Sequence, residues 1–204
     1  MVRRRRGEER PAGEITWRLF CALPIEAAVA ARIQETLEPV RSQLVRFRWL
    51  GPESWHVTLQ FYGDVPTSRL DDLQATLARA CRPAVPVDAE IRGMGAFPDM
   101  RGPRVVWVGV RDAAGVLREL HERIQDAGVE LGFQRENRRF HPHVTVARAR
   151  RSPAGPIARE LAPYLDRPIA PVRFPHVALY RSTLTEGGAR YEVLQRFELA
   201  GGPR

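Results

Sequence analysis

The chain has 204 residues, enough for one substantial domain or for two small lobes that share a core. It contains 44% hydrophobic and 27% charged residues, no apolar run near the roughly 18 to 20 residues of a membrane span, and no secretory signal, which indicates a soluble globular protein. The chain has only two cysteines, Cys21 and Cys81, which excludes a disulfide framework and favours a reducing, cytoplasmic setting. The net charge is +8, from 32 basic and 24 acidic residues. All of the basic residues are arginine, which indicates a coding bias more than a function.

A strand and a helix are the first elements that the sequence predicts. The segment "ITWRLFCAL" at 15–23 is rich in β-branched and aromatic residues, as strands are. Pro24 is expected to open a helix, because proline is tolerated at the first helical position. The apolar face of this helix repeats every four residues, at Ile25, Val29, Ile33 and Leu37.

A second strand, "WHVTLQFYG", is predicted at 55–63 and is expected to close at Gly63 and Asp64. A helix follows behind a Ser68 cap. Segment 81–87, "CRPAVPV", is interrupted by prolines and is the best candidate for a boundary between two halves. The apolar face of the helix has 3-4-3 spacing, at Leu70, Leu73, Leu77 and Ala80.

The remainder of the chain repeats this arrangement. Strands are predicted at 104–110, "RVVWVGV", and at 143–148, "HVTVAR", and a loop with Pro and Gly follows at 151–156. A helix lies between those two strands in the prediction, with apolar residues at Leu117, Leu120, Ile124 and Ala127.

The last two predicted strands, 174–182 and 190–199, flank a Gly-containing turn at 185–189 and are expected to pair as a hairpin. Strands and helices are distributed similarly on both sides of 81–87, without a steady β-α-β alternation. The sequence therefore predicts an α+β protein of two related lobes and not a doubly wound sheet.

The excess positive charge is confined to two stretches. Residues 1–12 hold five Arg and two Glu, residues 135–151 hold six Arg and one Glu, and the rest of the chain is balanced. We interpret the first stretch as part of a disordered basic tail at 1–13. The second stretch surrounds a histidine motif, where positive potential would attract an anionic substrate.

The motif in question is a tripeptide that occurs twice, as His56-Val57-Thr58 and as His143-Val144-Thr145, in a chain with only five histidines. Side chains at i and i+2 of a strand point to the same face. Each strand should therefore present one imidazole beside one hydroxyl, with its valine turned to the core.

Two such strands facing each other across a cleft would carry the groups that phosphoryl transfer needs without a metal. A neutral imidazole accepts a proton from the attacking oxygen, and a protonated one donates a proton to the leaving oxygen. The threonine hydroxyls can hydrogen-bond the non-bridging oxygens, where negative charge develops.

Other interpretations of the histidines were weighed. A single His-x-Thr on a strand is usually structural, but a second copy behind Pro142 and inside the densest arginine cluster favours a function. A metal site would use His141 and His143 with His56 or His176. No Asp, Glu or Cys lies near them at ligand spacing, and Pro142 constrains the pair, so the metal site is the weaker hypothesis.

The two remaining histidines are expected to have no catalytic role. His121 lies beside Leu117 and Leu120 on a predicted helix, which is typical of a surface or packing residue. His176 lacks the threonine two positions later, so we expect it to be structural.

The sequence resembles the RNA 2',3'-cyclic phosphodiesterases of the 2H phosphoesterase superfamily, also described as 2'-5' RNA ligase-like proteins. That family is defined by two His-x-Thr-x motifs, which "HVTL" at 56–59 and "HVTV" at 143–146 match. The resemblance covers nearly the whole chain beyond the tail, in the family's order. It includes "RLFCAL", "HVTLQFYGDV", "GAFPDMRGPRVVWVGV", "RFHPHVTVARAR" and "VALYRSTL".

The resemblance implies one bilobal domain at 14–204 with pseudo-twofold symmetry, antiparallel sheets that line a central cleft, and helices on the outside. It also implies the substrate, which is a 2',3'-cyclic phosphate on RNA ends or nucleotides. We further expect a monomer that uses no cofactor and no metal. Hydrolysis would leave a 2'-phosphate and a free 3'-hydroxyl. The implied catalytic residues are His56, Thr58, His143 and Thr145.

By the same resemblance, His143 would activate water and His56 would protonate the leaving 3'-oxygen, although the two roles are interchangeable on the sequence alone. Arg148 and Phe61 each lie five residues beyond their histidine and are candidates to contact phosphate and base. Strict strand alternation would place both on the opposite face.

Two further functions stay open from the sequence. One is 2'-5' ligation of RNA ends, the reverse reaction, which would use the same residues. The other is a non-catalytic RNA-binding protein, which the positive charge suggests. Two symmetric imidazoles argue against the second, because binding alone does not need them.

Overall fold

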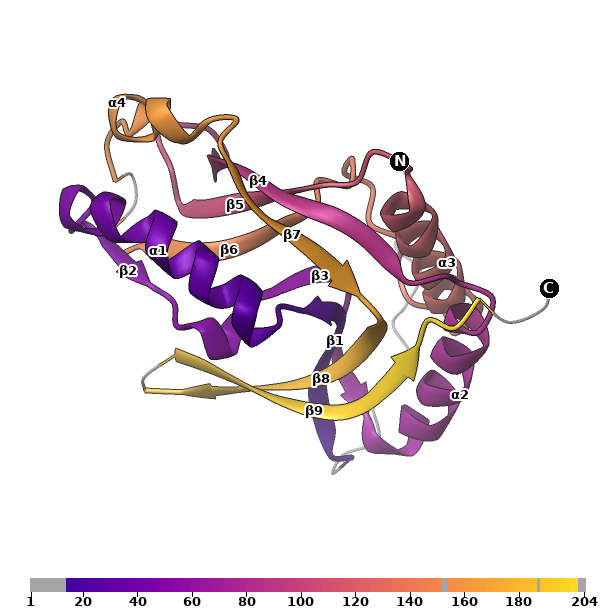
Figure 1. Cartoon of the computed structure of the whole chain (residues 1–204). Helices are drawn as coiled ribbons and strands as arrows, with labels where there is room; N and C mark the ends of the chain where they lie inside the picture. The colour runs from indigo at the N-terminus through magenta and orange to yellow at the C-terminus, as the bar shows by residue number, and fades with distance from the viewer. Residues whose placement is uncertain (1–13, 152–153, 187, 202–204) are drawn as a thin grey trace, which may run out of the picture.

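The structure is a computed structural model that describes residues 14–151, 154–186 and 188–201. The predicted basic tail at 1–13 lies outside the described residues. The described chain forms a mixed α/β fold around an antiparallel sheet (Figure 1). The strands are β1 (Thr16–Pro24), β2 (Phe47–Trp49), β3 (His56–Pro66), β4 (Val87–Phe97), β5 (Val105–Arg111), β6 (His143–Ala149), β7 (Pro168–Phe174), β8 (His176–Thr185) and β9 (Gly188–Glu198). The helices are α1 (Ala27–Gln43), α2 (Leu70–Cys81), α3 (Val116–Glu130) and α4 (Ala158–Leu161).

The sheet is continuous and curled, with the order β7-β4-β5-β6-β3-β1-β8-β9 and with β2 paired to β6. Its centre is the pairing of β3 with β6, where Val57 lies opposite Val144. Each half of the sheet thus has one His-x-Thr strand at its inner edge. The α+β class with two related halves is confirmed, but the halves share one sheet and do not form separate ones.

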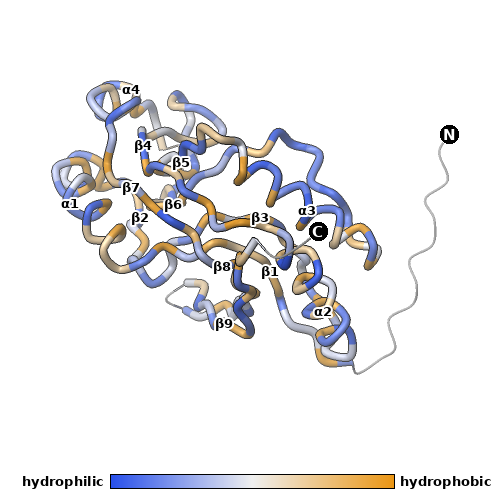
Figure 2. The backbone as a smooth tube through the Cα atoms, turned by 45° about the vertical axis from the view of Figure 1, so that its right-hand side comes forward, coloured by the Kyte–Doolittle hydropathy of each residue, from blue (hydrophilic) through white to orange (hydrophobic). Residues whose placement is uncertain are grey.

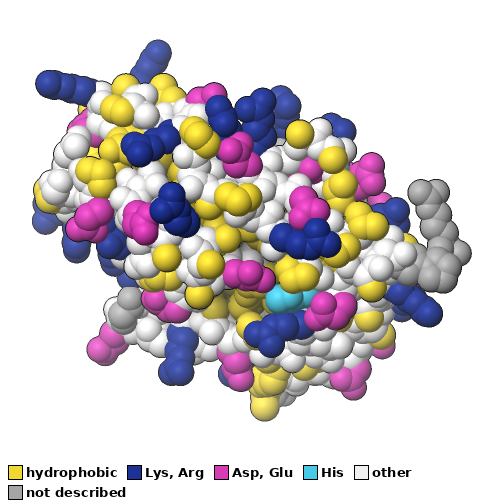
Figure 3. Space-filling model, viewed as in Figure 1, with side chains coloured by type: hydrophobic (Ala, Val, Ile, Leu, Met, Phe, Trp, Pro, Cys, Tyr) yellow, Lys and Arg dark blue, Asp and Glu magenta, His cyan; other side chains and the backbone are white. Residues whose placement is uncertain are grey.

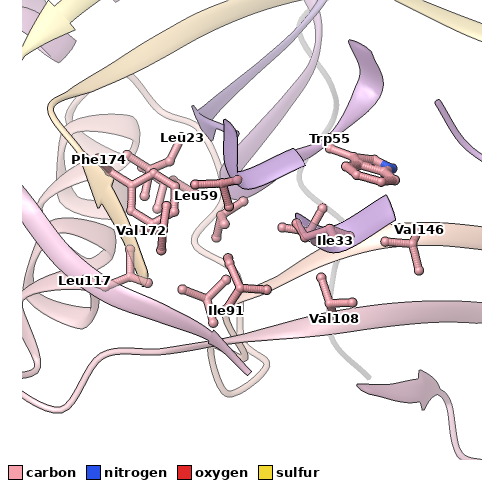
Figure 4. Packing of buried hydrophobic residues seen from close by; sticks show 14 of the residues in the cluster. Leu23, Ile33, Trp55, Leu59, Ile91, Val108, Leu117, Val146, Val172 and Phe174 are labelled. Atoms are coloured by element: carbon pink, nitrogen blue, oxygen red, sulfur yellow. The ribbon is translucent and has the colours of Figure 1, made fainter. Parts of the chain in front are cut away.

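One face of the sheet packs against the helices and forms the main core. In Figure 4, Ile91 of β4, Val172 of β7 and Leu59 of β3 approach one another, and Leu117 of α3 closes that end of the cluster. Val57 and Val144 are fully buried in the same core. Hydrophobic segments run along the central strands in Figure 2, whereas the helices carry mixed residues, as expected for elements with one buried face.

The predicted helical faces are largely confirmed. Leu73 and Leu77 of α2 are buried, and so are Leu117, Leu120 and Ile124 of α3. On α1 the buried residues continue past the predicted set to Val40. The predicted C-terminal hairpin is also present, since Thr185 of β8 pairs with Gly188 of β9.

Three predicted boundaries were wrong. Pro24 ends β1 opposite His56 and does not open the helix, because the fixed φ of proline is equally compatible with an extended strand end, and α1 begins at Ala27. Gly63 does not end β3, because glycine can adopt the positive φ of 71° found here and the strand continues to Pro66. Ser68 caps no helix, since its hydroxyl donates to Glu14 and α2 begins at Leu70.

Strands β4 and β7 were not predicted. β4 carries Gly93 and Gly95, which weaken a strand pattern, and β7 carries Pro168 and Pro171. Both prolines are tolerated because β7 is an edge strand. Segment 81–87 connects the first half of the sheet to β4 of the second half, as predicted. The boundary is not complete, because β8 of the C-terminal hairpin pairs with β1 of the first half.

No helix in the described part of the chain is long and apolar enough to cross a bilayer. On the face shown in Figure 3, arginine side chains are spread among acidic ones and form no single patch.

Candidate active site

The two His-x-Thr motifs lie side by side at the centre of the sheet. Since Val57 and Val144 are opposite each other and point into the core, the histidine and threonine on either side of each valine point to the other face. All four side chains line one cavity of about 940 Å³ and are partly buried. They are His56, Thr58, His143 and Thr145.

The two imidazoles are held in matching ways. Nδ1 of His143 lies 2.7 Å from the backbone carbonyl oxygen of His141. A carbonyl oxygen only accepts, so Nδ1 carries the hydrogen, and in the neutral ring Nε2 has the free lone pair. His56 is likewise hydrogen-bonded to the backbone of Ser54, again two residues earlier.

Aromatic rings support each imidazole on its own side of the cavity. The ring of His56 lies 4.8 Å from Phe20 and 5.2 Å from Tyr191, centroid to centroid. The ring of His143 lies 4.9 Å from Phe97. Packing of this kind restricts both rings to one orientation, which a positioned acid or base requires.

Both imidazoles are weakened as bases in the free protein. The pKa of His56 is lowered to about 4, mainly by burial. The hydrogen bond to Ser54 acts in the opposite direction, and the charges of His143 and Arg148 contribute to the lowering. Burial also lowers the pKa of His143, and the charges of His141 and Arg148 act in the same direction. Both rings are therefore mainly neutral at pH 7 in the free protein.

Arg148 and Phe61 line the same cavity, contrary to strict alternation. The cause is a matched pair of β-bulges. The register of β1 with β3 skips Leu59, and that of β5 with β6 skips Val146, so the fourth residue of each motif is the extra one. Each bulge shifts the alternation by one and turns the residue five positions beyond its histidine back to the cavity.

The remaining histidines occupy different surroundings. His121 is not a surface residue, since it is 5% exposed, stacks on Phe140 with a centroid distance of 3.9 Å, and reaches the wall of the cavity. His141 lies at the rim, 4.6 Å from the ring of Trp107. His176 begins β8 and does not line this cavity.

A metal site formed by these histidines finds no support in the described residues, where no group of three or more His, Cys, Asp or Glu side chains could hold an ion. The donors that the cavity does offer are imidazole, hydroxyl and guanidinium groups. Such a set of donors suits a bound anion, because charge-assisted hydrogen bonds to anionic oxygens are strong.

Other residues of the cavity were not singled out from the sequence. Phe97, Arg104 and Tyr191 all line it. Phe97 and Arg104 stand in the segment "GAFPDMRGPR", whose composition gives no functional signal. Tyr191 lies on a strand that pairs at the far side of β8, so only the curl of the sheet brings it to His56.

The model of the 2'-5' RNA ligase superfamily matches residues 27–186, a span that contains both motifs. The chain belongs to this superfamily. Its relatives include an RNA 2',3'-cyclic phosphodiesterase of Thermus thermophilus, which is 36% identical over 194 residues. The match covers 90% of this chain and 91% of the relative. Another from Aeropyrum pernix is 32% identical over 179 residues, 86% of this chain and 99% of the relative.

A third relative of the same name, from Geobacillus stearothermophilus, is 31% identical over 184 residues. This relative is longer, so the match covers 90% of this chain but 58% of the relative. Solved structures agree with the fold. A Thermus thermophilus protein aligns with a TM-score of 0.76 and 30% identity, over 90% of this chain and 98% of that one. E. coli LigT complexed with 3'-AMP aligns with a TM-score of 0.69 and 25% identity, over 90% and 98%.

Proposed function

We propose that this chain is an RNA 2',3'-cyclic phosphodiesterase, which hydrolyses the cyclic phosphate of RNA ends or nucleotides and leaves a 2'-phosphate. The observation that carries the proposal is the matched pair of His-x-Thr strands that open into one cavity. The names of its relatives and the binding of 3'-AMP by LigT support a nucleotide or RNA substrate.

In the proposed reaction, water attacks phosphorus while the bond from phosphorus to the 3'-oxygen breaks. One imidazole takes the proton of the water, and the other supplies a proton to the 3'-oxygen, so that the pair as a whole neither gains nor loses a proton over one turnover. His143 is proposed as the base and His56 as the acid. For His56 to be the acid, the bound phosphate must raise its pKa from about 4, as a nearby anion does.

Thr58, Thr145 and Arg148 are proposed to bind the non-bridging oxygens. Their side chains line the same cavity as the imidazoles. Negative charge grows on these oxygens as the attacking bond forms, so fixed donors stabilise the transition state more than the ground state. Phe61, 59% exposed and 5.4 Å from the ring of Phe20, is proposed to stack on a base.

The setting is proposed to be cytoplasmic and the protein a monomer. Both cysteines are free and buried, which suits a reducing compartment. Both motifs of the cavity come from one chain, so that a second copy is not needed to complete the site.

Turnover of a nucleoside 2',3'-cyclic phosphate is expected to continue in excess EDTA and to give the 2'-phosphate. The reason is that two imidazoles provide the proton transfers that a metal-bound water would otherwise supply. The product isomer is identified by NMR or chromatography, with a 5'-hydroxyl RNA in a parallel reaction to detect ligation. Loss of turnover in EDTA with recovery in a divalent ion would contradict the acid-base mechanism, and a 3'-phosphate product would contradict the assigned leaving group.

Replacing Thr58 or Thr145 with Val should lower kcat about 10- to 10³-fold, with a smaller effect on KM, because each change removes one donor to the developing charge. Valine keeps the shape and the strand preference of threonine, so the fold should be retained. Thr183→Val, on the exposed part of β8, is the matched control and should leave kcat unchanged. Equal kcat in all three variants would show that the motif hydroxyls do not contact the transition state.

A further inference from the structure

A second cavity of about 790 Å³ adjoins the first and is not used by the proposed chemistry. It extends from the segment between α3 and β6 to the turn that precedes α3. The two cavities share the residues of that segment, so they are two parts of one recess. The shared residues are His121, Arg135, Glu136, Asn137, Arg138, Arg139 and Phe140.

The shared segment is fixed to the body of the protein. Arg135 forms ion pairs with Glu122 and Asp126 of α3. The side chain of Gln125 accepts from the backbone N–H of Glu136 at 2.9 Å and donates to the carbonyl of Leu59, the bulged residue of β3, also at 2.9 Å. The segment is therefore a built part of the site, tied to the strand that carries the first motif.

Two guanidinium groups on this segment are left for a ligand. Arg138 and Arg139 are exposed, line both cavities, and form no ion pair with any carboxylate among the described residues. The nearest carboxylate in sequence, Glu136, accepts the backbone N–H of Arg138 and not its guanidinium.

The wall of the second cavity is positive on balance. Its other carboxylates are engaged, since Asp112 accepts the backbone N–H groups of Ala114 and Leu117 and Glu122 is paired with Arg135. Arg111 and Arg118 add two further guanidinium groups to the lining. This pattern is suited to a ligand with several negative charges.

We propose that this recess holds the phosphodiester backbone that precedes the cyclic end, with Arg138 and Arg139 as the phosphate contacts, so that the protein prefers RNA oligonucleotide ends to mononucleotides. The inference rests on the proposed function. A 2',3'-cyclic phosphate occupies both ribose hydroxyls of the last nucleotide, so the strand continues only from its 5'-oxygen. The second cavity shares a wall with the first and is positive on balance, so we assign it as the path of the strand that leaves the first cavity. That continuity favours RNA over an acidic protein as the ligand.

The test compares kcat/KM for a nucleoside 2',3'-cyclic phosphate with that for a short oligoribonucleotide ending in the same group. The wild type is expected to prefer the oligonucleotide. In the double variant Arg138→Gln/Arg139→Gln this preference should fall about tenfold or more, since two charge-assisted contacts are removed. The dependence of log Kd on log salt for an oligonucleotide ending in 2'-phosphate should become shallower by about 1.4, the value for two contacts to single-stranded nucleic acid.

Arg123→Gln is the matched control, because Arg123 is exposed on α3 and lines neither cavity. It should change neither the preference nor the salt dependence. An unchanged preference in the double variant would overturn the inference. The same loss in Arg123→Gln, or in Arg150→Gln at an exposed arginine that lines neither cavity, would also overturn it. Absence of turnover of both substrates by the wild type would contradict the proposed function itself, while the binding measurement would still decide the role of the two arginines.

Discussion

Replacing His143 with Ala is expected to lower kcat by roughly 10²- to 10⁴-fold, and replacing His56 with Ala by a similar factor. In the proposed mechanism each imidazole carries out one of the two proton transfers. Both imidazoles line one cavity, and each ring is held by a backbone hydrogen bond. Steady-state kinetics on a nucleoside 2',3'-cyclic phosphate measure the effect. The two losses should not add in the double variant, because the groups act as a unit.

His176→Ala is the matched control, since this histidine lies at the start of β8 and lines neither cavity. It should keep near-normal turnover. A His143 variant with the same activity as the control would show that the second motif is structural, and the proposed mechanism would then be wrong.

The same variants assign the two roles. A substrate with sulfur in place of the 3'-bridging oxygen has a leaving group that needs little protonation, so the variant that lacks the acid should recover on it. With the proposed roles, His56→Ala should lose much less on the sulfur substrate than on the oxygen one, and His143→Ala should lose equally on both. The reverse pattern would exchange the two assignments while leaving the pair intact.

The centre of the site was predictable because its signal is local. A strand imposes a period of two, so the spacing within His56-Val57-Thr58 decides which side chains share a face without any knowledge of the partner strand. The repeat at His143 then indicates two copies of one arrangement. Their position side by side, through Val57 and Val144, follows from the sheet order and was not contained in the spacing.

The surroundings of the site were less predictable because they depend on partner strands. The faces of Phe61 and Arg148 are set by bulges at Leu59 and Val146, and a bulge exists only relative to the strand beside it. His121 presents the pattern of an ordinary helix residue, and only the fold of the segment after α3 places Phe140 on its ring. Contacts between segments distant in the sequence therefore place these residues in the cavity wall, and the local sequence pattern does not indicate it.

The pH dependence is expected to be bell-shaped, with the maximum of kcat/KM on the acid side of neutrality and not at it. This profile reports the free protein, in which the pKa of His56 is about 4 and that of His143 is also lowered by burial. Below the lower apparent pKa no base is left, and above the higher one no acid is left. On the alkaline side kcat/KM should fall about tenfold per pH unit. The two values belong to the coupled pair and not to either residue.

The profile of kcat should lie at higher pH than that of kcat/KM, because the bound phosphate favours the protonated form of the imidazoles. Both profiles are measured on the mononucleotide substrate, with chemistry shown to be rate-limiting. A flat kcat/KM between about pH 5 and 9 would rule out the paired-imidazole mechanism.

Arg148→Gln provides a sharper form of this test, because the charge of Arg148 lowers the pKa of both His56 and His143. Its removal should raise both apparent pKa values of the free protein, so the whole kcat/KM bell should move toward neutrality. The height of the bell should fall because the proposed phosphate contact is lost. Arg123→Gln removes a charge of the same sign outside the cavity and should leave both limbs in place. A bell that loses height in Arg148→Gln but keeps its position would mean that the titrating groups are not the two imidazoles beside this guanidinium.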